Sequence, residues 1–125
     1  MKLFANLLLF AALAQPADHF TDWWTQFRAV AAKQDAKAVA AGVTFPIPWE
    51  NGNIRDIKSL EDFTQNYPRY FTPEITKIVA NKKPERMPNG IYSITWKARG
   101  SEYSIYFKPG PDKTFILDGL SEGPP

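Results

Sequence analysis

Six aromatic side chains are the residues of this chain best suited to bind a ligand. Tryptophan and tyrosine rings combine a broad apolar face with a polar tip, so a group of them can form the wall of an apolar pocket. The candidates come from two predicted helices and two predicted strands: Trp24, Phe27, Tyr67, Tyr92, Trp96 and Tyr103. The competing interpretation is that these rings form the hydrophobic core, which a small domain without disulfides needs for its stability.

No arrangement of polar residues has the spacing of a known catalytic or metal site. The single histidine, His19, stands at the start of the first predicted helix, where we expect it to face solvent. One histidine without any cysteine disfavours a transition-metal site. An enzyme would need a carboxylate with a shifted pKa beside a tyrosine, for which Asp56 and Glu102 are the candidates. We therefore predict no catalytic residue, no metal and no cofactor.

The first fourteen residues have the pattern of a secretory signal peptide. Met1-Lys2 is a short basic start, residues 3–13 form an apolar run, and Ala12-Leu13-Ala14 is a small-x-small cleavage site. The run is too short to span a bilayer, which needs about 20 apolar residues. We therefore expect cleavage after Ala14, a single mature domain over residues 15–125, and a periplasmic or secreted location in a bacterium.

The charge balance disfavours two classes of partner. The chain carries 15 Lys and Arg against 13 Asp and Glu, a formal net charge of +2 at pH 7. Nucleic acids and anionic membranes both require clustered positive charge. The nearest cluster, Lys82-Lys83 with Arg86, is interrupted by Pro84 and is most simply a solvated loop. We therefore predict that the mature chain binds neither nucleic acid nor a membrane.

The first two thirds of the chain have the pattern of helices with one hairpin inserted. Aromatic and apolar residues recur at three- and four-residue intervals from Phe20 to Ala31, which predicts a helix that ends near residue 33. Further helices are expected after the N-cap Asp35, from 59 until Pro68 stops the helix, and from 72 to 79. The hairpin is expected over 43–57 around an Asn-Gly turn, with Trp49 opposite Ile54 and with two prolines that require a sheet edge or a bulge.

After a polar linker over 81–89, the period of the pattern changes to two residues. Apolar and polar residues alternate over 91–98, 102–108 and 114–118, with short turns between these segments. Three sequential strands with short turns predict an antiparallel meander. The tail over 122–125 is expected to fray.

Helices first and strands second predict an α+β fold, in which N-terminal helices pack on a curved antiparallel sheet that ends in a three-stranded meander. The runs FTDWWTQFRAVAAKQDAKAVAAGVTFPIPW and KSLEDFTQNY, followed by the meander, resemble small exported bacterial members of the NTF2-like superfamily. This resemblance implies a cystatin-like α+β cone, whose interior some members use as a pocket for isomerase or hydrolase chemistry and others for binding or dimer contacts. No catalytic residue carries over, because no motif in this chain matches one.

The sequence leaves several functions open. Our leading hypothesis is an exported, non-enzymatic domain that binds a small apolar ligand or a protein partner through the cone or the open sheet face. The alternatives are a periplasmic immunity-type inhibitor, a small isomerase-like or hydrolase-like enzyme with an acid in the cone, and a homodimer. A homodimer would use the open sheet face, on which we expect Ser93, Thr95, Lys97 and Tyr106.

Overall fold

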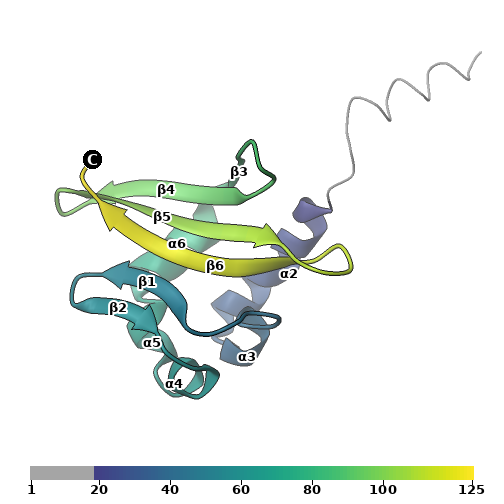
Figure 1. The fold of residues 1–125 in the computed structure, drawn as a ribbon, viewed down its shortest axis with the longest axis horizontal. Coiled ribbons are helices and arrows are strands. Elements are labelled where there is room, and N and C mark those ends of the chain that lie inside the picture. The colour runs from purple at the N-terminus through teal and green to yellow at the C-terminus, as the bar shows by residue number, and fades with distance from the viewer. Residues whose placement is uncertain (1–18) are drawn as a thin grey trace, which may run out of the picture.

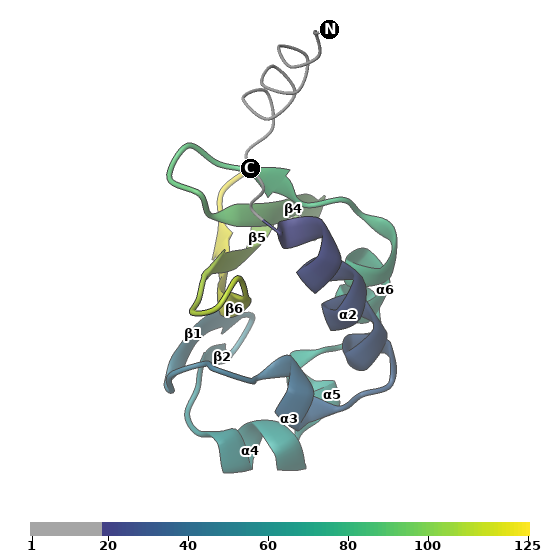
Figure 2. The ribbon, with the colours of Figure 1, turned by 90° about the vertical axis from the view of Figure 1, so that its right-hand side faces the viewer.

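The computed structural model describes residues 19–125, so the expected signal peptide lies outside the described residues. The helices are α2 (Phe20–Ala32), α3 (Ala36–Val39), α4 (Leu60–Gln65), α5 (Tyr67–Tyr70) and α6 (Pro73–Asn81). The strands are β1 (Ile47–Asn51), β2 (Ile54–Ile57), β3 (Glu85–Arg86), β4 (Tyr92–Ala98), β5 (Ser101–Pro109) and β6 (Phe115–Gly123). Figure 1 looks onto the uncovered face of the sheet, and Figure 2 shows α2 and α6 on the opposite face. The predicted α+β class is confirmed.

The sheet has six strands in the order β2-β1-β6-β5-β4-β3. The predicted meander is present, because β5 pairs antiparallel with both β4 and β6. The prediction of a wholly antiparallel sheet is wrong, since β1 lies parallel to β6 with Trp49 opposite Leu120. Short turns force consecutive strands to be antiparallel. No turn joins β1 to β6, so their relative direction is set by packing, and the sheet is mixed.

The first helix forms on the face that its spacing predicted. Phe20, Trp24, Phe27 and Ala31 are buried against the sheet, and the helix ends at the C-cap Lys33. Asp18, a residue type that often caps helices, lies outside the described residues, and the N-cap position is held by His19, which is half-buried.

The helix α6 also forms as predicted. The side chain of Thr72 accepts a hydrogen bond from the Ile75 N–H at 3.2 Å, and Pro73 occupies the first turn, where its missing N–H costs nothing. Ile75 and Val79 point into the core. Together, α2 and α6 form the layer that covers the sheet.

The turn of the β1–β2 hairpin lies one residue later than predicted. Asn51 lies opposite Ile54, so the turn consists of the next two residues, and a bulge opposes Trp49 and Glu50 to Arg55. The predicted pairing of Trp49 with Ile54 is therefore wrong. The bulge allows Trp49 to face the core, where it is fully buried. Of the two prolines, only Pro48 lies within β1, next to this bulge, and Pro46 precedes the strand.

Three further boundaries differ from the predictions. Pro68 does not stop a helix but lies in the first turn of α5, a position that accepts proline. The polar linker contains the two-residue strand β3, which pairs with β4. The tail is not frayed up to Gly123, because Glu122 and Gly123 belong to β6. A bulge near Gly119 interrupts the alternation of β6, which hid its second half from pattern analysis.

Candidate functional site

The six candidate aromatic residues do not line one pocket. Trp24 and Phe27 each place their rings 5.2 Å from the ring of Phe107 on β5. Tyr67 belongs to a separate cluster at the other end of the domain, with its ring 5.1 Å from that of Phe71. Trp96 and Tyr103 stack on each other at 5.6 Å.

Burial separates one of these six residues from the other five. Five of them are at most 7% exposed, whereas Tyr92 is half-buried. The hydroxyl of Tyr67 donates to Ala31 O at 3.2 Å, and burial raises the pKa of this phenol. The space between α2 and the meander is occupied by ring-to-ring packing, so most of the candidate rings serve as core.

Two of the six residues, Trp24 and Tyr92, meet at an open groove of about 540 Å³. We call it the α2–β4 groove. It lies between the first turns of α2, the start of β4 and the segment that leads from α6 to β3. Its lining consists of Phe20, Thr21, Trp24, Thr25, Arg28, Asn81, Lys82, Lys83, Pro84, Arg86 and Tyr92.

The floor of the groove is aromatic because helix and strand spacing place three rings together. Phe20 and Trp24 are one turn apart on α2, and their ring centroids are 5.8 Å apart. The ring of Tyr92, the first residue of β4, stacks parallel to Phe20 at 3.7 Å. Phe20 and Trp24 are only 5% and 6% exposed, so the half-buried Tyr92 provides most of the apolar surface of this floor.

The walls of the groove are basic. Arg28 lies one turn beyond Trp24, and its Nη2 donates to Ala80 O at 2.6 Å, which fastens α2 to the C-terminal end of α6. Lys82 and Lys83 follow α6 directly and line the groove, and Arg86 on β3 completes the set. No Asp or Glu is among the described residues that line it. The site therefore combines an apolar floor with positive walls.

The basic walls of the groove were not among the sites predicted from the sequence. From the sequence, Lys82, Lys83 and Arg86 were expected in a solvated loop, and no role was predicted for Arg28. The one local signal was the position of Arg28, four residues after Trp24 on the same helix. The other basic residues of the walls, Lys82, Lys83 and Arg86, lie more than 50 positions after Arg28 in the sequence.

A second hollow, of about 430 Å³, lies where the β1–β2 turn meets the end of β6. Glu122 accepts hydrogen bonds from the Gly52 N–H at 3.0 Å and from the Tyr103 hydroxyl at 2.9 Å. Its own N–H donates to Glu50 Oε1 at 3.1 Å. The Gly52 N–H and, next, the Tyr103 hydroxyl hold the pKa of Glu122 below its ordinary value of 4.5. These contacts tie the turn to β6 and give the carboxylate a structural role.

This carboxylate makes stability depend on pH. A group whose folded-state pKa is lowered stabilises the fold above its unfolded-state pKa, and this contribution is lost as the pH falls through the folded-state value. We therefore expect Glu122→Gln to be less stable than the wild type near neutral pH, with the difference shrinking as the pH falls below 4.5. Urea unfolding at a series of pH values measures this difference. A difference that stays constant across the series would contradict the assigned role.

The two candidate acids for catalysis lie away from the α2–β4 groove. Asp56 pairs with the exposed Pro48, and Glu102 precedes the inward-pointing Tyr103, which places both carboxylates on the uncovered sheet face. His19 does not line the groove either. Within residues 19–125, no group of three or more His, Cys, Asp and Glu side chains could hold a metal ion.

The polar face that was considered for a homodimer is the uncovered face of the sheet (Figure 1). On it the hydroxyl oxygens of Thr95 and Ser104 are 2.7 Å apart, and those of Tyr106 and Ser121 are 3.3 Å apart. Homodimer formation stays a prediction.

Comparison with known proteins gives no match from which a function could be inferred. No protein-family model matches the chain, and neither a curated protein nor a solved structure matches it. None of the helices described over residues 19–125 has the length and apolar character needed to cross a membrane.

Proposed function

We propose that this protein is a non-enzymatic binding domain that holds an amphipathic organic anion in the α2–β4 groove. The observation that carries the proposal is the combination of three stacked rings on the floor with basic side chains and no acid on the walls. The apolar body of the ligand would lie against Tyr92 and the small exposed parts of Phe20 and Trp24. Its negative group would face Arg28 and Lys83.

The basic walls of the groove narrow the hypothesis of a small apolar ligand to a ligand that also carries a negative charge. A purely apolar ligand would cover the rings but would make no use of the Lys83 charge or of the N–H donors that Arg28 has beside the one bonded to Ala80 O. A carboxylate, sulfonate or phosphate accepts charge-assisted hydrogen bonds from such groups, and these are stronger than neutral ones. The groove therefore favours a ligand that is both apolar and anionic.

Export to the periplasm and membership of the NTF2-like superfamily are part of this proposal. The signal-peptide pattern of the first fourteen residues supports export. The arrangement of a long first helix against a sheet that ends in a meander supports the superfamily. In this member the ligand would lie at the open end of the cone, because its interior is filled by rings.

Titration with 8-anilinonaphthalene-1-sulfonate tests the proposal, since this fluorescent probe joins aromatic rings to a sulfonate. We expect saturable binding at one site, with a change in the fluorescence of Trp24 and its neighbour Trp23. Lys83→Glu, which replaces a wall cation by an acid, is expected to weaken binding by roughly tenfold, equivalent to one charge-assisted hydrogen bond.

The matched control is Lys37→Glu, which makes the same charge change on an exposed position of α3, remote from the groove. It should leave the affinity unchanged. The neutral probe N-phenyl-1-naphthylamine should bind more weakly than the sulfonate and respond little to Lys83→Glu. Equal affinities of both probes, or equal effects of both substitutions, would overturn the proposal.

A further inference from the structure

The outer edge of β4 is only partly covered. The edge strand β3 pairs with β4 at two positions, Arg86 with Tyr92 and Glu85 with Ser93. Beyond Ser93 the chain of β3 continues as the segment that leads back to α6. The rest of β4, from Ile94 to Ala98, therefore has no strand on its outer side within the described fold.

The backbone groups along this edge are set by the alternation of a strand. The Met87 N–H donates to Ile91 O at 2.7 Å, which places the carbonyl of Ile91 on the outer side of β4. Backbone groups alternate between the two sides of a strand, so those of Ser93, Thr95 and Lys97 also point outward. Ser93 is paired by β3, whereas Thr95 and Lys97 present their N–H and C=O groups at an open edge, and both residues are exposed.

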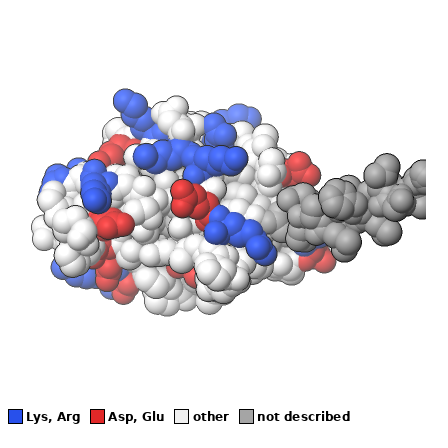
Figure 3. All heavy atoms as spheres, turned by 90° about the horizontal axis from the view of Figure 1, so that it is seen from above, with Lys and Arg blue, Asp and Glu red and all other residues white. Residues whose placement is uncertain are grey.

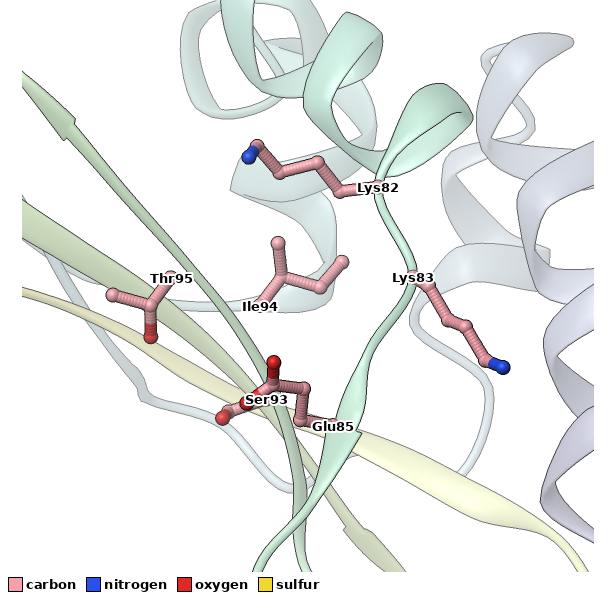
Figure 4. Close-up of a pocket in the computed structure, with 6 residues that line it drawn as sticks. All are labelled: Lys82, Lys83, Glu85, Ser93, Ile94 and Thr95. Carbon is pink, nitrogen blue, oxygen red and sulfur yellow. The ribbon is translucent and has the colours of Figure 1, made fainter.

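A hollow of about 170 Å³ lies where β3 ends and this edge begins. Its lining includes Lys82, Glu85, Ile94 and Thr95, and Figure 4 shows the Lys82 side chain extending over Ile94 while Lys83 turns toward α2. The hollow lies in line with β3, which is the position that the next residues of an added strand would occupy.

The charges around the edge indicate the kind of strand that fits. Among the described residues, Lys82, Lys83 and Lys97 make no ion pair with a carboxylate, whereas the nearby Arg99 is paired with Glu74 at 2.9 Å. Figure 3 views the molecule from above, the side where β4 and β3 lie in Figure 1, and shows Lys and Arg side chains lying across it with Asp and Glu side chains between them. Lys82 and Lys97 could therefore pair with the side chains of an incoming acidic strand, whereas Lys83 turns toward α2 and Glu85 is the one acid that lines the hollow.

We propose that the open edge of β4 receives an extended, acidic segment of a protein partner as an additional strand. Main-chain hydrogen bonds to Thr95 and Lys97 would supply the affinity, and the lysines would select acidic side chains. A second copy of this chain fits less well, because it would bring its own lysines against the same edge. The opposite edge strand, β2, has only four residues, and Arg55 already donates to the carbonyl of Ile54.

An eight-residue peptide in which glutamate alternates with valine, carrying a fluorescent label, tests this inference by polarisation. We expect saturable binding that weakens as salt is added. Lys97→Glu should weaken binding by about tenfold, since it turns an attraction into a repulsion at the edge. Hydrogen exchange of the full chain should show slower exchange at the amides of Thr95 and Lys97 when the peptide is bound.

Two matched probes separate backbone pairing from charge attraction alone. The same peptide methylated on alternate backbone nitrogens keeps its charges but cannot complete a strand ladder, and it should bind at least tenfold more weakly. A peptide that alternates lysine with valine should not bind. Undiminished binding of the methylated peptide, or unchanged exchange at Thr95 and Lys97, would overturn the inference.

The inference and the groove proposal can fail separately. Thr95 and Lys97 do not line the α2–β4 groove, so Lys97→Glu should leave the binding of the anilinonaphthalene probe unchanged. Protection of the Thr95 and Lys97 amides in the protein alone, together with a dimeric mass in solution, would show that a second copy occupies the edge. That outcome also overturns the inference.

Discussion

Replacing Phe107 with alanine is expected to lower the free energy of unfolding by about 3–5 kcal/mol, the range for a large aromatic residue removed from a core. Phe107 is fully buried in the second half of β5. Its ring meets those of Trp24 and Phe27 nearly edge-on at 5.2 Å, and that of Trp23 at 5.8 Å. Because these three rings belong to α2, the substitution would leave a cavity at the junction between the first helix and the sheet.

Urea or guanidinium unfolding, followed by circular dichroism, measures this effect. The control is Leu60→Ala, which also shortens an apolar side chain but at a position that is 42% exposed. We expect it to change the free energy by no more than about 0.5 kcal/mol. A loss below about 1.5 kcal/mol for Phe107→Ala would contradict this expectation and show that the rings of α2 can close the cavity.

The elements that local signals specify were predictable. The spacing of Phe20, Trp24 and Phe27 identifies the buried face of α2, and the Thr72-Pro73 pair marks the start of α6. The strands of the meander alternate without interruption until the bulge in β6. In each case, the residues that determine the element are neighbours in the sequence, so pattern analysis reaches them.

The elements that depend on distant contacts were not predictable in the same way. The strand β3 has two residues, too few for any period, and exists because it pairs with β4. The parallel contact between β1 and β6 joins Trp49 to Leu120, across 71 positions of the chain. Such strand pairings depend on tertiary packing, and the residues around each strand do not indicate which other strand it pairs with.

The candidate site divides along the same line. Trp24 and Tyr92 were candidates by residue type and do meet at the groove, whereas Phe27, Tyr67, Trp96 and Tyr103 are core residues. An aromatic ring looks the same to sequence analysis in both roles. The basic walls come from Arg28 and from the segment after α6. These parts are distant in the sequence and lie side by side in the fold, where Arg28 donates to Ala80 O.

The glycine at position 119 records such a distant contact in its backbone. Gly119 lies in β6 with φ of +146°, a backbone conformation that residues with a Cβ atom rarely adopt. A Cβ atom added there would stand 2.9 Å from the carbonyl oxygen of Pro48 on β1. The close approach of β1 to β6, and with it the mixed sheet, therefore requires a residue without a side chain at this position.

Gly119→Ala is consequently expected to lower the free energy of unfolding by about 2–4 kcal/mol, combining backbone strain with a clash that only a shift of β1 can relieve. The matched control is Gly52→Ala, which also has a positive φ, of +62°, but has no atom within 4 Å of the added Cβ. Strain alone should cost about 1–2 kcal/mol there. Denaturant unfolding of both variants measures the difference. If the two variants lose equal stability, the approach of β1 to β6 is loose, and the parallel pairing does not depend on the glycine.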